Sequence, residues 1–533
     1  MPYYSVIPLS PARRERYTYR TGTDLPNGSV VSIRFGRRQD LGIVWSPVEP
    51  HVKAALAEPT GVVLPDTTRE LAAWVSREYL APLGVALKLT LNKQIIQYAP
   101  EVSAASAAAL ASPEAATDTP RPLLLIGPRR AIRYRELVSA ARQAQTSTLV
   151  IVPEINLTPE AVERYGGALA ETVAYHSRLT PKQRAAVWWR VATGDPVTVV
   201  GTRSALWLPW ERLGLLVLDE EDDPNYKQEQ TPRYHARPVA ARLAQLTGAS
   251  LVYGSVTPSL EAYAQAMEGR VTIETLPAAA TRLHLAALPE HDRLLGYELW
   301  SALRASFGLA VLYAPTFLHE RLLTELATAF PAAKTAVFSP EQRSGELEKL
   351  LRQITQGKIQ ILIGGPAIAR AWGFTAVMVG VIELDYLLQL PDFRTTERTY
   401  GLLKKLGGLA KPGADLIIQT GVADHPVLAA LTKPYGEFAS SELAERQLLR
   451  LPPAERLTRI LFTDQDQLLA LKAAEAAAGS LRAAGHDASV SDAAMPLRHG
   501  QYRCQVLVRG NPSAVAGHLD LRWNVEVDPI TLL

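Results

Sequence analysis

Short runs of consecutive apolar residues, separated by stretches with helical spacing, limit the fold of this chain more than any other feature. A first series lies at residues 123–127, 149–153, 197–201, 215–219 and 251–255. A second series lies at residues 309–313, 335–339, 359–364, 377–384 and 415–420. Strands that are apolar on both faces are typical of parallel sheets covered by helices. The pattern therefore predicts a multidomain α/β protein with two parallel-sheet lobes, at residues 122–300 and 301–440.

The flanking regions predict three further parts. Residues 29–45 alternate apolar and polar side chains around a Gly-Arg-Arg-Gln-Asp turn, which predicts a hairpin in a small β-rich domain at residues 1–98. The Ala-rich stretch 99–121 has no apolar period and is interpreted as a linker. A strand, an Ala-rich helix and further strands predict a small α+β domain at 441–533.

Composition excludes several classes of protein. The chain has 533 residues, of which 47% are hydrophobic, so collagen and wholesale disorder are excluded. Its single cysteine, Cys504, rules out a disulfide framework and a zinc site of paired Cys-x-x-Cys motifs. No apolar stretch is long enough to cross a bilayer, and a cytoplasmic location is expected.

Charge is unevenly distributed. The net charge is only +3, but residues 11–40 contain seven arginines against three acids. A basic patch of this kind favours nucleic acid as a partner.

The clearest chemical signal is an acidic cluster at the end of one predicted strand. Residues 215–218 run directly into Asp219, Glu220, Glu221, Asp222 and Asp223. Acids at the carboxyl end of a buried strand hold Mg²⁺ and a water in phosphate-transferring enzymes. The alternative is a solvated acidic turn.

Several motifs resemble those of the PriA family, the replication-restart helicases also called primosomal protein N′. They occur in the family's order and cover nearly the whole chain: IRFGRR, GIVW, LVIVPEINLTPE, GTRSALWLPW, LVLDEEDDPNYKQ, PRYHAR, GSVTPS, ILIGGPAIARAWGF, PDFRTTER, ERQLLRLPP and VEVDPITLL. The resemblance implies two RecA-like helicase lobes, with a small β-barrel DNA 3′-end-binding domain before them and an α+β domain after them. It also implies DNA as the partner, either forked, single-stranded or with free 3′ ends, and the replicative helicase or its loader and single-strand-binding protein as further partners.

The chain departs from the family where ATP would bind. A phosphate-binding loop needs Gly-x-x-x-x-Gly-Lys-Ser/Thr, whereas the stretch that begins at Gly127 reads GPRRAIRY. Ile132 stands where close backbone approach is needed, and Tyr134 is too long to replace the Mg²⁺ ligand. Arg133 is the residue of this degenerate loop that could meet a phosphate.

Other family features are also missing. Leu409 replaces the first arginine of a late motif, Asp222 replaces the histidine of the DEEH motif, and Gly364-Gly365-Pro366 replaces a Gly-Thr-Gln turn. The family's zinc module would fall between Thr316 and Phe317, and His319 is interpreted as a surface residue. The linker replaces a winged helix. No zinc is expected, and ATP with Mg²⁺ is not expected as a bound cofactor.

Candidate DNA-binding residues lie in two regions. Residues 222–237 interleave aromatic and cationic side chains, as single-strand binders do, although an ordinary loop is the alternative. The candidates in this loop are Tyr226, Lys227, Arg233, Tyr234, His235 and Arg237. The resemblance adds residues of the first domain, in which Thr18 stands where the family usually has Asp: Tyr17, Thr18, Arg34, Gly36, Arg37, Arg38 and Lys53. Trp207 and Trp210, in the neighbouring loop, are predicted to pack in the interior.

Three hypotheses follow. The leading one is a PriA-like protein that binds branched DNA at stalled forks and helps to load the replicative helicase without unwinding, so that Asp219 and Glu220 are vestigial. The alternative is an ATP-dependent 3′→5′ DNA helicase with a divergent nucleotide site, in which Asp219 binds Mg²⁺, Glu220 activates water and Arg133 serves as the phosphate cation. A third is a scaffold without DNA affinity.

Overall fold

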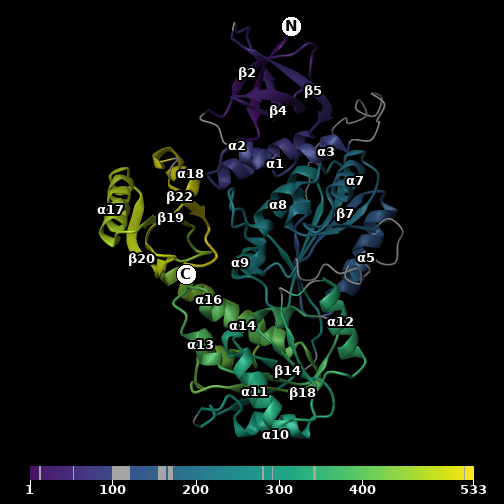
Figure 1. Cartoon of the computed structure of the whole chain (residues 1–533), viewed down its shortest axis with the longest axis vertical. Coiled ribbons are helices and arrows are strands. Elements are labelled where there is room, and N and C mark those ends of the chain that lie inside the picture. Colours follow the sequence, from purple (N-terminus) through teal and green to yellow (C-terminus); the bar gives the residue numbers. More distant parts are fainter. Residues whose placement is uncertain are drawn as a thin grey trace.

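The computed structural model contains four folded parts arranged along the chain (Figure 1). It describes residues 1–10, 14–51, 53–98, 120–153, 162, 164–165, 172–278, 281–290, 292–339, 342, 344–371, 373–520 and 523–532. Most of the predicted linker, residues 99–119, therefore lies outside the described residues. Within the described part, no helix is both long enough and apolar enough to cross a bilayer.

The N-terminal domain begins with a closed β-barrel of strand order β1-β2-β5-β3-β4. Its strands are β1 (Tyr3–Pro8), β2 (Tyr17–Arg20), β3 (Ser29–Phe35), β4 (Arg38–Pro47) and β5 (Ala55–Val63). The predicted hairpin is the β3–β4 pair, in which Phe35 lies opposite Arg38. Gly36 adopts a φ of 62° in the turn, a left-handed conformation that glycine tolerates without steric cost. The sequence prediction of a hairpin is confirmed.

Three helices join the barrel to the first lobe. They are α1 (Asp66–Glu78), α2 (Leu83–Leu87) and α3 (Lys93–Gln97). The indole Nε1 atoms of Trp188 and Trp189 donate to the carbonyls of Thr90 and Ile95, at 2.9 and 3.0 Å. One hydrophobic core continues from these helices into the first lobe, so the two units share their packing.

The first lobe is a parallel sheet of strand order β12-β6-β11-β10-β7-β9-β8. Its strands are β6 (Leu123–Ile126), β7 (Ser147–Ile151), β8 (Thr172–Tyr175), β9 (Thr198–Gly201), β10 (Leu213–Asp219), β11 (Ser250–Ser255) and β12 (Thr272–Thr275). Its helices are α5 (Arg130–Gln143), α7 (Pro181–Ala192), α8 (Ala236–Thr247) and α9 (Leu260–Met267). Alternate residues of the central strands enter two separate cores, one under α7 and α8 and the other under α5. This two-sided burial is why the strands read as continuous apolar runs.

The second lobe is a parallel sheet of strand order β13-β18-β17-β14-β16-β15. Its strands are β13 (Arg282–Ala286), β14 (Ala310–Tyr313), β15 (Thr335–Phe338), β16 (Ile361–Gly364), β17 (Ala376–Val381) and β18 (Ala410–Gln419). Its helices are α10 (Tyr297–Ala305), α11 (His319–Ala329), α12 (Ser344–Thr355), α13 (Leu384–Leu388), α14 (Thr395–Gly407), α15 (Pro426–Ala430) and α16 (Tyr435–Leu448). Helices again cover both faces, with α10 and α11 on one and α12 and α14 on the other.

Three strands of the two lobe sheets were not predicted from the sequence: β8, β12 and β13. All three lie at sheet edges, where strands are less enclosed and lack a continuous apolar run. Since β13 pairs with β18 in the second sheet, the predicted lobe boundary at residue 300 is corrected to a point before Arg282.

The C-terminal domain is an antiparallel sheet of strand order β20-β21-β19-β22, and α17 packs on it. Its elements are β19 (Leu457–Asp464), α17 (Gln467–Ala483), β20 (Asp487–Arg498), β21 (Gln501–Arg509), α18 (Pro512–Val515) and β22 (Asn524–Val527). The predicted α+β fold is confirmed. Its lone thiol, Cys504, is buried in this sheet.

The shared core predicts that Trp188 stabilises the barrel side of the molecule as well as the first lobe. Trp188→Ala removes a buried indole and its hydrogen bond to Thr90, which should cost about 3–5 kcal/mol. We expect a lower urea midpoint and faster amide exchange in α1–α3. Phe307→Ala, at a ring that is 95% exposed, is the control and should change little. Unchanged exchange in α1–α3 would contradict the shared core.

Candidate functional site

The acidic cluster lies at the carboxyl end of β10, where Asp219 is fully engaged by side chains of its own lobe. The hydroxyls of Tyr134 and Tyr165 donate to its two carboxylate oxygens, at 2.7 and 2.6 Å. The guanidinium of Arg130 donates to Oδ1 at 2.8 Å. Both oxygens of the predicted Mg²⁺ ligand are therefore already hydrogen-bonded.

Arg130 fills the space in front of the acidic pair. Its side chain also pairs with Glu220 and donates to the carbonyl of Gly127. Arg129 caps α5 with a left-handed φ of 57°, so the helix begins at Arg130 itself. Tyr134 lies one helical turn later, and its hydroxyl fits because residue 254 is glycine: a Cβ there would lie 1.7 Å from that oxygen. The degenerate loop thus places an arginine and a tyrosine where a phosphate cradle would be.

Arg133, the candidate phosphate cation, points elsewhere. Its guanidinium pairs with Glu136 at 2.9 Å and with Glu274 at 3.3 Å, on the outer side of α5. Arg130, and not Arg133, is the arginine of the loop that contacts the acidic cluster. The contact of Arg130 could have been predicted from its spacing to Tyr134. Residues four apart lie on the same face of a helix, and this face of α5 meets the ends of the strands.

Cations of the second lobe complete the cluster from across the cleft. The ammonium of Lys405, on α14, lies 2.8 Å from Glu220 and 2.6 Å from Asp222. Arg370, which follows β16, pairs with Asp223. Lys405 belongs to the late motif in which Leu409 replaces an arginine. This motif therefore still places a cation in the cleft between the lobes, but the cation pairs with carboxylates of the first lobe.

A second group of cross-lobe ion pairs lies beside the first. Arg394 joins Glu261 of the first lobe to Glu397 of the second, the latter at 3.0 Å. Arg446 pairs with Glu397 at 3.0 Å and anchors α16 to the same group. Because a buried charge is costly unless it is paired, moving the lobes apart would leave these carboxylates and cations without partners.

Burial and neighbouring charges move the carboxyl groups in opposite directions. Burial raises the pKa of Asp222 to about 6, and the adjacent Glu220 adds to that shift, while Lys405 opposes it. Burial also raises the pKa of Glu220, but the charges of Lys405 and Arg130 outweigh it and lower the pKa to about 2. Glu220 is therefore the carboxylate that keeps its charge beside Lys405 when the pH falls below about 6.

The predicted aromatic DNA loop is buried. Tyr226 and Tyr234 are each 2% exposed. The Tyr226 hydroxyl donates to the Asp219 carbonyl at 2.6 Å, and the Tyr234 ring packs edge-on against Trp207. The prediction that these rings stack on bases is wrong for this arrangement, because stacking needs an exposed face. Trp207 and Trp210 are buried, as predicted.

The cations of this loop are also engaged. Lys227 donates to the carbonyls of Val527 and Asp528, and burial lowers its pKa to about 8. Arg233 donates to the side chain of Asn524, also in the C-terminal domain.

The last two candidates of the loop, His235 and Arg237, are half-buried at the wall of a cavity between the lobes. Burial, followed by the charge of Arg237, holds the pKa of His235 well below its usual value. Arg237 itself pairs with Glu221 at 2.9 Å and with Glu261 at 3.5 Å. The loop therefore serves as an interdomain joint in this structure.

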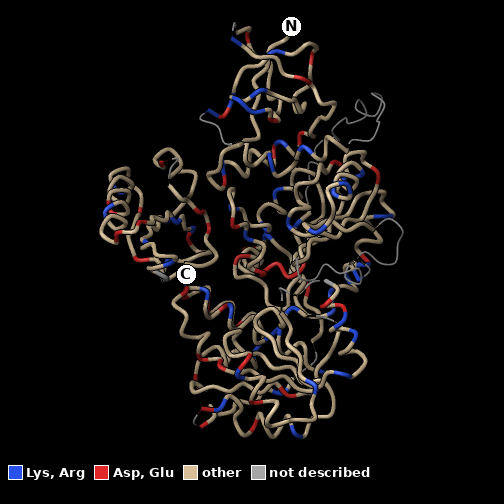
Figure 2. The backbone as a smooth tube through the Cα atoms, in the orientation of Figure 1, with Lys and Arg blue, Asp and Glu red and all other residues tan. Residues whose placement is uncertain are grey.

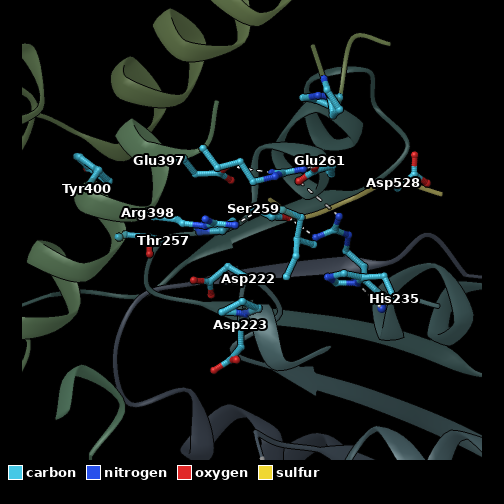
Figure 3. A pocket seen from close by; sticks show the side chains of 18 of the residues that line it. Asp222, Asp223, His235, Thr257, Ser259, Glu261, Glu397, Arg398, Tyr400 and Asp528 are labelled. Carbon is cyan, nitrogen blue, oxygen red and sulfur yellow. Dashed lines mark hydrogen bonds and ion pairs between the residues drawn. The ribbon is translucent and has the colours of Figure 1, made fainter. Parts of the chain in front are cut away.

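A cavity of about 540 Å³ lies where the two lobes, α1 and the C-terminal domain meet. Figure 3 shows Asp222 and Asp223 on one side of it, Glu397, Arg398 and Tyr400 on another, and Asp528 and His235 on the side away from Tyr400. Several polar atoms of its wall have no hydrogen-bond partner among the described residues: Thr257 Oγ1, Arg370 Nε, Arg394 Nε and Tyr400 Oη. These four atoms are themselves buried within the wall.

The candidates in the barrel lie near one another at the β3–β4 turn. The ring of Tyr17 packs edge-on against that of Phe35, with the ring centroids 5.2 Å apart. The start of β2 therefore lies beside the turn that contains Gly36. Thr18 follows on β2, opposite Ser5. Lys53 is exposed two residues before β5, whose first residue lies opposite Tyr19.

The arginines of this turn are free. Arg34, Arg37 and Arg38 are exposed, and no carboxylate among the described residues pairs with them. Unpaired guanidinium groups beside an aromatic ring suit the phosphates and bases of a DNA end.

Two parallel-sheet lobes that meet at strand-end acids, preceded by a small basic barrel, define a protein with two RecA-like lobes. A family model for the PriA 3′ DNA-binding domain matches residues 6–92. Replication restart protein PriA of Bacillus subtilis (strain 168) is 29% identical over 466 residues, which are 70% of this chain and 57% of the relative. PriA of Haemophilus influenzae is 31% identical over 400 residues, or 60% and 55% of the two chains. The chain is PriA-like, and it spans little more than half the length of these relatives.

Solved structures with similar lobes are more distant. Dbp5 of S. cerevisiae bound to RNA and ADP BeF3 has a TM-score of 0.43 and 15% identity, over 68% of this chain and 98% of Dbp5. RecG bound to a three-way DNA junction has a TM-score of 0.42 and 15% identity, over 70% and 52% of the two chains.

Arg130 and Arg133 should differ sharply in their effect on stability. Arg130→Leu leaves Asp219 and Glu220 buried without their shared cation and should cost about 3–5 kcal/mol. Arg133→Leu, at a partly exposed surface pair, should cost less than about 1 kcal/mol. Thermal unfolding of the two variants checks this, and equal midpoints would contradict the placement of Arg130.

Asp222 should make stability depend on pH. Its folded pKa of about 6 lies above the unfolded value of about 3.9, so the folded state binds the proton more tightly. The stability that results is fully present below pH ~4 and is lost as the pH rises through ~6. Between pH ~4 and pH ~6, we expect the unfolding midpoint of Asp222→Asn to fall by less than that of the wild type. Asp424→Asn, at an exposed carboxylate, is the control and should follow wild type. An unchanged profile for Asp222→Asn would overturn the assignment.

Proposed function

We propose that this protein binds branched or single-stranded DNA at stalled replication forks and supports loading of the replicative helicase, without ATP-driven unwinding. The similarity to replication restart proteins and the match to a 3′ DNA-binding domain support the first half. The free arginines at the barrel turn provide its phosphate contacts. The replicative helicase or its loader and single-strand-binding protein are the proposed protein partners.

The proposal that the protein does not unwind DNA with ATP rests on the contacts of Arg130 with Asp219 and Glu220. Mg²⁺ needs carboxylate oxygens that can coordinate it, and a nucleotide needs open space before the strand ends. Here Arg130, Tyr134 and Tyr165 occupy the oxygens of Asp219, and Lys405 with Arg130 neutralises Glu220. A nucleotide would have to displace a buried guanidinium from two carboxylates.

The cross-lobe ion pairs give the lobes a role that needs no nucleotide. In an ATP-driven motor the nucleotide bridges the lobes and its turnover moves them. Lys405, Arg370 and Arg394 make that bridge with protein charges alone. The lobes then act as a fixed support for the DNA-binding barrel.

ATP hydrolysis and fork binding, measured on the same preparation, test the proposal. We expect no ATP hydrolysis above that of Glu220→Gln, with or without DNA. Hydrolysis that DNA stimulates and Glu220→Gln abolishes would refute it. Strand displacement with ATP that is lost in Arg133→Ala would instead establish the divergent-helicase alternative.

Fork binding should depend on the barrel turn and on salt. Replacing both Arg37 and Arg38 with Ala should weaken binding and reduce the slope of log affinity against log salt by about 2, since each phosphate contact contributes about 0.9. Fluorescence anisotropy on forks with and without a 3′ leading-strand end measures both effects. Arg352→Ala, at an exposed arginine of α12, is the matched control. If it weakens binding equally, the barrel turn is not the DNA contact.

A further inference from the structure

Four large apolar side chains lie exposed at the carboxyl edge of the second sheet. They follow β13, β18, β17 and β14, which are consecutive neighbours in the strand order. The four are Leu288 (41% exposed), Val422 (42%), Tyr386 (44%) and Phe317 (64%). Single exposed apolar residues are ordinary, but one from each of four adjacent loops forms a continuous surface. These four residues are called the lobe 2 patch.

Contacts between the loops hold the lobe 2 patch in place. The rings of Phe317 and Tyr386 meet edge-on, with centroids 5.3 Å apart. Asp385 accepts hydrogen bonds from the Thr420 hydroxyl and from the Gly421 backbone, the latter at 2.9 Å. Leu288 packs so closely on Gly421 that a Cβ there would lie 3.2 Å from its side chain. The patch is therefore preformed, and binding does not have to overcome the entropic cost of ordering these side chains.

The position of the patch points to a ligand. In open parallel sheets, ligands bind at the carboxyl ends of the strands. In the first lobe this edge is filled by Arg130 and its partners, and beyond β16 the second lobe is in contact with the first. The ends of β13, β18, β17 and β14 carry the apolar side chains instead.

Charge selects the kind of occupant. The loops that carry the patch and the residues beside them contain six carboxylates: Glu290, Asp292, Glu320, Glu383, Asp385 and Asp424. Arg293 is in these loops too, and Arg321 nearby is already paired with Asp292 at 2.8 Å. Figure 2 shows acidic segments gathered around this corner of the second lobe, near α13. An acidic rim repels phosphates and attracts cationic side chains.

We propose that the lobe 2 patch docks a partner protein through an amphipathic segment that presents apolar side chains flanked by Lys and Arg. The aromatic pair Phe317 and Tyr386 is the anchor, since buried aromatic residues dominate binding energy at protein interfaces. The carboxylates form the polar rim and set the specificity for a basic segment. This surface is separate from the DNA contacts of the barrel, so the two can fail independently.

The test uses the full chain and a fluorescein-labelled Leu/Lys peptide patterned as an amphipathic helix of about five turns. Fluorescence anisotropy should show salt-sensitive binding that Phe317→Ser and Tyr386→Ser each weaken about tenfold or more. A Leu/Glu peptide of the same pattern should not bind. Glu383→Lys should weaken the Leu/Lys peptide without any loss of an apolar contact.

The matched control is Phe307→Ser. Phe307 is more exposed than Phe317 but precedes β14, at the opposite edge of the sheet. The proposal is overturned if Phe307→Ser weakens the peptide as much as Phe317→Ser, or if neither does. It is equally overturned if Phe317→Ser lowers the affinity for oligo(dT), which would make the patch a base-stacking surface. Concentration-dependent self-association that Phe317→Ser abolishes would identify a second copy of the chain as the occupant, and would also overturn it.

Discussion

The contact between Arg130 and the Asp219–Glu220 pair decides how the rest of the molecule is organised. A carboxylate pair at the end of a buried strand must be neutralised, because burying an unpaired charge costs several kcal/mol. In this chain the neutralising groups are Arg130, at the start of α5 in the first lobe, and Lys405, on α14 in the second lobe. The ion pair between Lys405 and Glu220 thus helps to fix the position of the second lobe against the first.

The C-terminal domain closes the assembly by the same means. Lys227 and Arg233 reach its last strand and the residues beyond, while Arg456 pairs with both Asp528 and Glu78. Residues 222–237, predicted to bind single-stranded DNA, are therefore fixed between the first lobe, the end of α1 and the C-terminal domain. Their aromatic rings pack inside the first lobe, while Lys227 and Arg233 reach the C-terminal domain.

Charge also divides the surface by function. The barrel turn carries exposed arginines, whereas the exposed edge of the second lobe carries carboxylates and exposed apolar side chains. The near-zero net charge of the chain hides this division. A protein so arranged presents surfaces of opposite charge at its two ends, so one ligand does not compete for both.

The sequence by itself determined the strands that are buried on both faces, because an apolar run is a direct consequence of such burial. It also placed Asp219 and Glu220 at a strand end and Gly36 in a turn. It did not reveal the edge strands β8, β12 and β13, whose patterns are weaker because one side is open. Only the tertiary structure decided that Arg130 meets the acids while Arg133 faces outward, since that depends on where α5 begins. Only the tertiary packing decided that Tyr226 and Tyr234 are buried within the first lobe and that Lys227 is buried against the C-terminal domain, because a local pattern does not specify which distant residues cover it.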